Sequence, residues 1–321
     1  MVIVLLVIIL LSSAALDCSL PLQPRLLPHQ HVSLQYSRES TLCLKDYLLI
    51  GTHGSSAYRL DCMSLVDDRG VRMKSLAGKL TPGLIKQWAL NQHYDIYSQL
   101  ALGARYVHLE VAVHDGEWVT IHSFLAGKLS DDLDQITRFL DHTTDGFALV
   151  HLQHFGETTR DHTNKTCMDH IHELAPKYHC SDPVTRATPL RALTGKLVVL
   201  GGDGLQIELY PGDYTGDVAT FDSNRTTHRI QMHPPSQLNH PKTLLGFQWV
   251  LTPGTHEIAV DAVDPFHQSG LFDRVTVTSK TRLRDYLATH PDMFHVFIVD
   301  HFDEETRICI EEYNTRRLRL S

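Results

Sequence analysis

The stretch "SQLALGARYVHLEVAVHDGEWVTIH", residues 98–122, contains the end of a helical pattern and two strand patterns. Apolar residues at helical spacing run through residues 84–102, and short apolar runs follow at 105–111 and 117–122. His108 and Glu110 interrupt the first run and are two residues apart, so on a strand both side chains project from the same face. The stretch therefore predicts a helix followed by strands, one of which carries ionisable groups on one face.

The same alternation continues on both sides of this stretch. Further apolar runs lie at 47–51, 147–152, 196–201, 247–252 and 294–300, and helical patterns lie at 129–142, 166–177 and 281–289. Strands that alternate with helices predict a parallel sheet with crossover connections, and at 321 residues the expected form is a single-domain α/β barrel. Residues 201–243 are rich in Pro and Gly and are predicted to form a long loop with little regular structure.

Polar residues recur where these runs end. In a parallel barrel the carboxyl ends of the strands meet at one mouth, where the active site of such a fold lies. His53 follows the first run, His122 ends the 117–122 run, and Asp300 closes the last run. His151 lies near the end of the 147–152 run, and His108 and Glu110 lie on the 105–111 run. These six residues are the candidate site. Three other histidines are interpreted as surface or packing residues, namely His114, His142 and His154.

The overall charge argues against one class of partner. The chain has 37 acidic and 29 basic residues and a formal net charge of −8. Affinity for nucleic acid comes chiefly from Lys and Arg, so no nucleic-acid partner is expected near neutral pH. The 22 histidines would make the chain much more positive in an acidic compartment.

The N-terminus has the pattern of a secretory signal. Residues 1–15, "MVIVLLVIILLSSAA", are an apolar run followed by small residues, and we expect a signal peptide there. A signal anchor is the alternative, because basic residues do not precede the run. Residues 16–40 read as a surface extension, and residues 41–315 as the barrel domain. The sequence thus predicts a secreted protein or one in the lumen of the secretory pathway.

Cysteines and glycosylation motifs are consistent with that route. Six cysteines follow the expected cleavage site, and Cys43 and Cys62 bracket the turn that carries His53. We predict a disulfide between these two, because it would clamp that loop. The sequons that begin at Asn164 and Asn224 predict N-glycosylation in a secreted chain.

Several blocks together resemble one enzyme family. They are "IGTHGSSAY", "NQHYDIYSQLALGARYVHLEVAVHDGEWVTIHSF", "GFALVHLQHF", "LTGKLVVL", "FQWVLTP" and "VFIVDHF", within residues 43–305. In order and spacing they are similar to the X-domain family of phosphatidylinositol-specific phospholipases C, especially its single-domain members. The resemblance implies an irregular TIM-type barrel that hydrolyses a phosphoinositide or a related phosphodiester. It also implies peripheral contact with a membrane surface.

The resemblance also assigns roles to three candidates. By position, His53 corresponds to the general base that acts on the inositol 2-hydroxyl, and His122 to the general acid that protonates the leaving glycerol oxygen. Asp300 corresponds to the carboxylate that orients the first histidine. Imidazole suits both proton transfers near neutral pH.

The charged part of the family's site differs in this chain. Relatives neutralise the phosphate with an arginine or with calcium, whereas this chain has Gly54 after the first histidine and His108, Glu110 and His151 at the positions of acidic ligands. Two imidazoles and one carboxylate suit zinc or another transition metal better than calcium, so these three residues are predicted metal ligands. The alternative is a catalytically inactive barrel that binds lipid headgroups, glycans or a protein.

Overall fold

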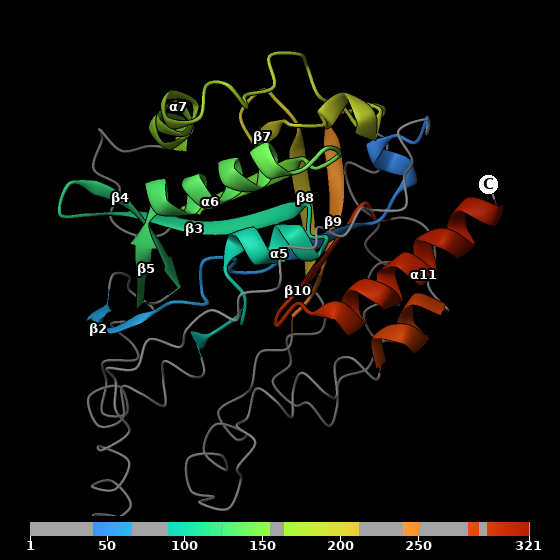
Figure 1. Cartoon of the computed structure of the whole chain (residues 1–321), viewed down its shortest axis with the longest axis horizontal. Helices are drawn as coiled ribbons and strands as arrows, with labels where there is room; N and C mark the ends of the chain where they lie inside the picture. The colour runs from blue at the N-terminus through green and yellow to red at the C-terminus, as the bar shows by residue number, and fades with distance from the viewer. Residues whose placement is uncertain are drawn as a thin grey trace, which may run out of the picture.

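Parallel strands form the framework of the protein (Figure 1). The computed structural model describes residues 41–65, 89–122, 124–154, 164–211, 240–250, 282–288 and 294–320. In the order of their pairing, the parallel strands are β7 (Leu197–Leu200), β6 (Ala148–His154), β3 (Tyr106–His114), β1 (Leu49–Thr52), β10 (Val296–Val299), β9 (Thr243–Trp249) and β8 (Gln206–Pro211). The first strand therefore lies beside the last, as in a TIM-type barrel.

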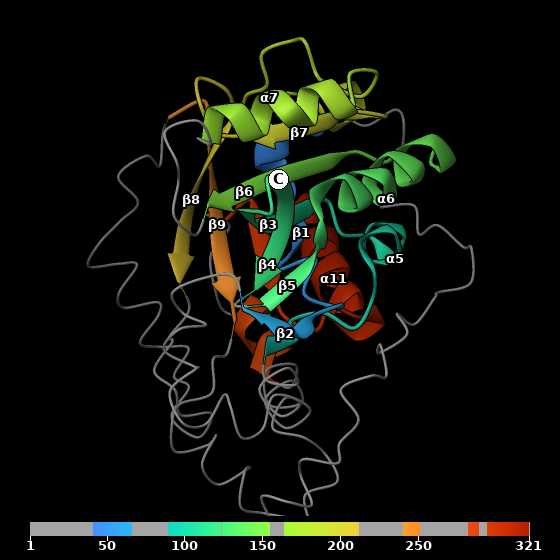
Figure 2. The ribbon, with the colours of Figure 1, turned by 90° about the vertical axis from the view of Figure 1, so that its left-hand side faces the viewer.

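The sheet is open on one side, so the barrel is irregular. Among the described strands, no pairing joins β7 to β8, and residues 201–205 connect the two directly. Figure 2 shows β7 running across the view near the upper ends of β8 and β9 rather than alongside them. Strand β8 lies within 201–243, so the prediction of little regular structure there was wrong for its first part. Residues 212–239 of that segment lie outside the described residues.

An antiparallel extension grows from β3. Strand β4 (Glu117–His122) pairs antiparallel with β3, β5 (Phe124–Lys128) with β4, and β2 (Asp61–Leu65) with β5. The β3–β4 turn has positive φ at Asp115 (52°) and Gly116 (79°), the conformation typical of a two-residue hairpin. The prediction that 117–122 is another parallel strand was wrong. The hairpin instead returns the chain toward the barrel and ends at His122.

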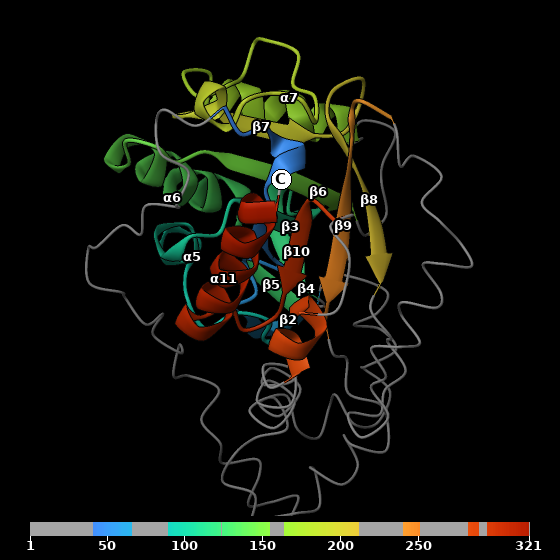
Figure 3. The same cartoon turned by 90° about the vertical axis from the view of Figure 1, so that its right-hand side faces the viewer.

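Helices cover the outer face of the sheet (Figures 1 and 3). Helices α5 (Ile96–Leu102), α6 (Leu129–His142) and α7 (Asn164–Leu174) pack with β3, β6 and β7 in one apolar cluster. Helix α11 (Glu304–Leu320) and a helix at 282–288 pack on β9 and β10. Short 3-10 helices lie at Leu44–Asp46 and Leu190–Leu193. The described helices include none long and apolar enough to cross a membrane.

Strand alternation separates this outer layer from the barrel interior. Val107 and Leu109 of β3 pack among the covering helices. Tyr106 belongs instead to the interior cluster, and His108 and Glu110 follow it at intervals of two on the same face. Both polar side chains are almost fully buried, with exposed fractions of 1% and 2%. The strand thus carries ionisable groups into the barrel.

The predicted disulfide is not present. Cys43 is a free thiol whose Sγ lies 3.6 Å from the Thr41 carbonyl oxygen, and the side chain of Cys62 lies outside the described residues. Cys43 pairs with Pro189 in an isolated bridge, whereas Cys62 lies on β2, which pairs with β5. Cys167, Cys180 and Cys309 are also free thiols. The predicted signal peptide, the extension 16–40 and Asn224 lie outside the described residues, and Asn164 begins α7.

Candidate functional site

The site lies where β1 and β10 end side by side. The two strands pair in parallel with Thr52 opposite Val299, so His53 and Asp300 both follow directly after their strands. The backbone N–H of His53 donates to the Val299 carbonyl oxygen over 3.0 Å. Two residues that are 247 positions apart in the chain are thereby fixed next to each other.

His53 and Asp300 form a hydrogen-bonded pair. His53 Nδ1 lies 2.9 Å from Asp300 Oδ1, and the side chains are 16% and 14% exposed. Burial raises the pKa of Asp300, but the charge of His53 and its hydrogen bond outweigh burial, so this pKa lies below its ordinary value. The carboxylate therefore holds the imidazole with Nδ1–H toward itself and can stabilise the imidazolium.

Asn91 and Gln92 complete this arrangement, and the sequence analysis did not single them out. Asn91 Nδ2 lies 2.8 Å from both His53 Nδ1 and Asp300 Oδ1. Gln92 donates to the carbonyl oxygens of His53 and Val299 over 2.9 and 3.0 Å. Both amides lie just before α5, inside the stretch 84–102 that was predicted to be helical. That prediction was wrong for residues 90–95, which are not helical, and residues 84–88 lie outside the described residues.

His122 approaches His53 from the antiparallel hairpin. The two ring centroids are 5.8 Å apart and the ring planes are nearly perpendicular, at 88°. His122 Nδ1 lies 2.8 Å from the Ala89 carbonyl oxygen, so this nitrogen carries the proton and donates it to the carbonyl. Nε2 is then the nitrogen of His122 that can exchange a proton with a ligand.

His108 lies below His53 in the barrel. Their rings stack with centroids 5.3 Å apart and planes at 15°. His108 Nε2 donates to Gln153 Oε1 over 2.8 Å, and Nδ1 accepts a long hydrogen bond of 3.3 Å from the Gly54 N–H. Burial, followed by the charges of His53 and His151, lowers the pKa of His108 to about 3. His108 is therefore a neutral imidazole at physiological pH.

His151 lies on the other side of His108. The ring centroids of this pair are 5.4 Å apart, and His151 Nδ1 is 2.7 Å from the Tyr106 hydroxyl. Burial lowers the pKa of His151 to about 4. His151 also lines a cavity of about 300 Å³ between the end of β7 and the start of β8, together with Gly201, Gly202 and Gln206.

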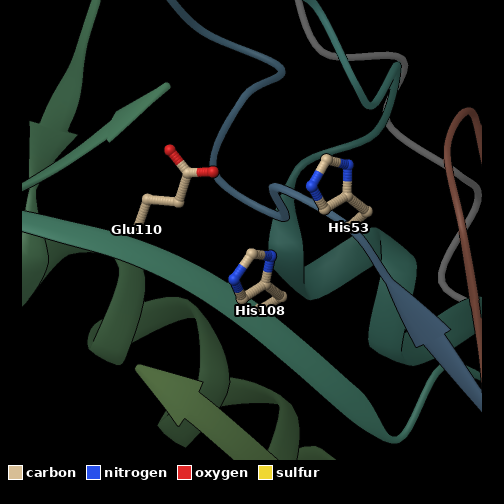
Figure 4. A group of neighbouring side chains, drawn as sticks. All are labelled: His53, His108 and Glu110. Atoms are coloured by element: carbon tan, nitrogen blue, oxygen red, sulfur yellow. The ribbon is translucent and has the colours of Figure 1, made fainter. Parts of the chain in front are cut away.

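Three side chains converge closely enough to share an ion (Figure 4). One ligand atom from each of His53, His108 and Glu110 lies within 4.8 Å of the others. His151 is not a member of this group, although it was predicted to share a metal with His108 and Glu110. The structure thus brings His53 into the place that the sequence analysis gave to His151.

Arginines near the site elements are engaged elsewhere. Arg59 Nη2 lies 2.8 Å from Asp132 Oδ1, and its guanidinium packs where a side chain at Gly127 would lie. Arg105, at the start of β3, donates to the carbonyl oxygens of Leu100 and Ala104. The described side chains that surround His53 are imidazoles, amides and carboxylates.

Comparison with known structures identifies the fold. The match to the phosphatidylinositol-specific phospholipase C from Listeria monocytogenes covers 92% of this chain and 99% of that enzyme, at 15% identity and a TM-score of 0.54. The match to the Staphylococcus aureus enzyme covers 84% of this chain and 93% of that enzyme, at 12% identity and a TM-score of 0.55. That structure concerns modulation of membrane binding. The fold is that of a phosphatidylinositol-specific phospholipase C. At such low sequence identity, the structural similarity establishes the fold alone.

One curated sequence is also similar to the phospholipase C-like chain. It is a PI-PLC X-box domain-containing protein from Dictyostelium discoideum, 26% identical over 143 residues. The match includes 44% of this chain but only 18% of the length of that relative. No family model matches. The sequence-based resemblance to the PI-PLC family and the TIM-type barrel are thus confirmed.

Proposed function

We propose that this protein is a secreted phosphodiesterase of the phospholipase C type, with phosphatidylinositol, a glycosylated derivative or a related phosphodiester as substrate. The observation that carries the proposal is the pair of histidines His53 and His122, 5.8 Å apart between ring centroids, each with Nδ1 hydrogen-bonded to an oxygen. Both imidazoles thereby present Nε2 for proton transfer, which is what an acid–base pair needs.

The proposed reaction is an intramolecular displacement at phosphorus. His53 Nε2 takes the proton of the inositol 2-hydroxyl, and this oxygen forms a bond to phosphorus. The bond between phosphorus and the glycerol oxygen breaks, and that oxygen takes the Nε2 proton of His122. The products are a cyclic inositol phosphate and diacylglycerol. Asp300, 2.9 Å from His53 Nδ1, stabilises the imidazolium that forms.

A lipid substrate implies work at a membrane surface. The structural relatives are phospholipases C, and the S. aureus structure concerns membrane binding by that enzyme. The apolar N-terminal residues 1–15 support delivery to the secretory pathway. We therefore place the protein outside the cell or in the secretory lumen, in peripheral contact with a lipid surface.

Release of cyclic inositol phosphate from phosphatidylinositol vesicles tests the proposal. His53→Ala and His122→Ala should each lower kcat/KM by about 10²- to 10⁴-fold, the usual contribution of general acid–base catalysis. The double variant should lose little more, because residues that act in one step are strongly non-additive. His114→Ala is the matched control, because His114 lies on the same hairpin and its side chain is 39% exposed.

The outcomes distinguish an active phosphodiesterase from a catalytically inactive barrel that binds lipid. Near-normal turnover in either single variant would contradict the acid–base assignment. Absence of turnover in the wild type, together with retained vesicle binding, would support the inactive binding barrel instead.

A further inference from the structure

His53 and His108 share a pattern that is typical of metal-binding histidines. Each ring has one nitrogen anchored to a side-chain oxygen: His53 Nδ1 to Asp300 over 2.9 Å, and His108 Nε2 to Gln153 over 2.8 Å. Metal-bound histidines almost always donate their second ring N–H to such an acceptor, which fixes the tautomer and the ring orientation. The pattern directs His53 Nε2 and His108 Nδ1 to the role of ligand, and an ion at His108 Nδ1 would replace the long 3.3 Å hydrogen bond that this nitrogen accepts from the Gly54 N–H.

Glu110 supplies the third donor. Its side chain is 2% exposed, and a ligand atom of Glu110 lies within 4.8 Å of ligand atoms on both histidines. Figure 4 shows the carboxylate reaching from β3 into the space beside the two rings. Atoms bound to one zinc ion at about 2.1 Å lie roughly 3.4 Å apart in a tetrahedral site, so small side-chain rotations close the triad.

The donor set decides the class of ion. Calcium takes six to eight oxygen ligands at about 2.4 Å, whereas this site offers two imidazole nitrogens and one carboxylate. Zinc and similar first-row ions bind such a set readily, with a fourth position left for water or substrate. His151 is held by Tyr106 at 2.7 Å and is not part of the triad.

We propose that His53, His108 and Glu110 bind one divalent ion of the zinc class. The ion and the base function of His53 then exclude each other, because the Nε2 lone pair cannot bind metal and accept the substrate proton at the same time. Zinc is therefore an inhibitor of the acid–base reaction at this site. The binding claim is independent of the proposed function, and only the inhibition rests on it.

Zinc titration of untagged, chelator-treated protein tests the binding. Calorimetry should give one zinc per chain for the wild type and no comparable binding of calcium. Glu110→Gln should weaken zinc binding by at least about 10-fold, the loss expected even for a partner of a ligand. Glu117→Gln is the matched control: this carboxylate is 58% exposed, lies on the β3–β4 hairpin, and should leave zinc affinity unchanged.

Two further measurements keep the test decisive. Zinc should raise the unfolding temperature of the wild type and not that of Glu110→Gln, whose fold is checked by circular dichroism. If that variant fails to fold, His108→Gln replaces it in the same comparison. Absence of stoichiometric zinc in the wild type, or equal affinity in a folded triad variant, overturns the site.

Activity gives a separate readout. Added zinc should lower the rate of cyclic phosphate release by the metal-free wild type, and a chelator should restore it. A rate that rises with zinc overturns the exclusion. If the wild type hydrolyses no phosphodiester, the proposed function fails while calorimetry still decides the metal site.

Discussion

In the proposed reaction, Asn91 would act through His53 and Asp300. Its amide contacts both partners of the pair at 2.8 Å, and the residue is only 6% exposed. Gly54 makes room for it, because a Cβ at Gly54 would lie 3.2–3.3 Å from the Asn91 side chain. Gly54 also has φ of +47°, which disfavours most side chains. The side chain of Asn91 therefore occupies the space beside the His53 imidazole that a side chain at position 54 would also need.

We expect Asn91→Ala to lower kcat about 10-fold with KM changed less than about two-fold, because a loosened imidazole affects the reaction more than substrate binding. Steady-state kinetics on phosphatidylinositol vesicles measures both constants. Adding Gly54→Asn should restore part of kcat, since Asn tolerates positive φ and returns an amide to the vacated space. An unchanged kcat in Asn91→Ala, or no recovery in the double variant, contradicts a positioning role.

For single residues, the sequence predicted the site residues at strand ends better than it predicted the neighbouring amides that hydrogen-bond to them. His53 and Asp300 are found together because each directly follows a strand, a relation visible in the apolar runs. Asn91 and Gln92 reach the site from a segment that precedes a helix. The triad contains His53 and not His151 because of the directions of their side chains within the barrel. His53 is hydrogen-bonded to Asp300, His108 to Gln153, and His151 to Tyr106.

At the scale of elements, direction was harder to predict than location. The predicted helix at 129–142 coincides with α6, and the run at 117–122 coincides with β4. The antiparallel direction of β4 follows from Asp115-Gly116, whose positive φ values form a tight hairpin. That dipeptide is a strong hairpin signal that the sequence analysis did not use. Strands β2 and β5 are five-residue strands with shifted registers and no clear apolar alternation.

Asp132 joins α6 to this hairpin. The carboxylate has no exposed side-chain area, accepts from the Thr120 hydroxyl over 2.7 Å, and pairs with Arg59 at 2.8 Å. Burial raises the pKa of Asp132 to about 6, against the opposing effects of Arg59 and Thr120. The folded protein thus binds a proton at Asp132 more tightly than the unfolded chain does.

The sign of the resulting pH dependence follows from linkage. Because the folded pKa lies above the unfolded value, the stability contributed by protonation of Asp132 is present at low pH and is lost as pH rises through about 6. Asp132→Asn should therefore cost about 1 kcal/mol more at pH 5 than at pH 7, measured by urea unfolding. Asp131→Asn, a 53% exposed neighbour, should show no such difference. An equal cost at both pH values for Asp132→Asn would contradict the raised pKa.

At the scale of the molecule, the two ends of the described chain stabilise each other. The backbone N–H of Leu48 donates to Asn314 Oδ1 over 2.8 Å, and Asn314 Nδ2 donates to the Leu48 carbonyl oxygen over 2.9 Å. Helix α11 thereby holds the start of β1 against β10, which keeps His53 beside Asp300. The apolar runs predicted the parallel barrel, whereas α11 has little amphipathic pattern and was not predicted.

A buried histidine at the opposite end of the barrel links three strands. The backbone of His295 bonds to Leu245 of β9 and to Leu49 of β1, and its Nδ1 accepts the Leu245 N–H over 2.8 Å. Burial, followed by the charges of Arg186 and Arg317, lowers the pKa of His295 to about 4. The folded state therefore favours its neutral form.

Acid should weaken the barrel through His295. Its folded pKa lies below the unfolded value of about 6.5, so the unfolded chain binds more protons and stability falls as pH drops from about 6.5 toward 4. At pH 5 the loss from this group is about 2 kcal/mol, partly offset by Asp132. His295→Asn keeps an acceptor for the Leu245 N–H without titrating, so its unfolding free energy should fall less between pH 7 and pH 5. His142 is exposed, so the unfolding free energy of the control variant His142→Asn should fall between these pH values as that of the wild type does. If His295→Asn and wild type lose equal stability in urea unfolding at the two pH values, acid sensitivity lies elsewhere in the barrel.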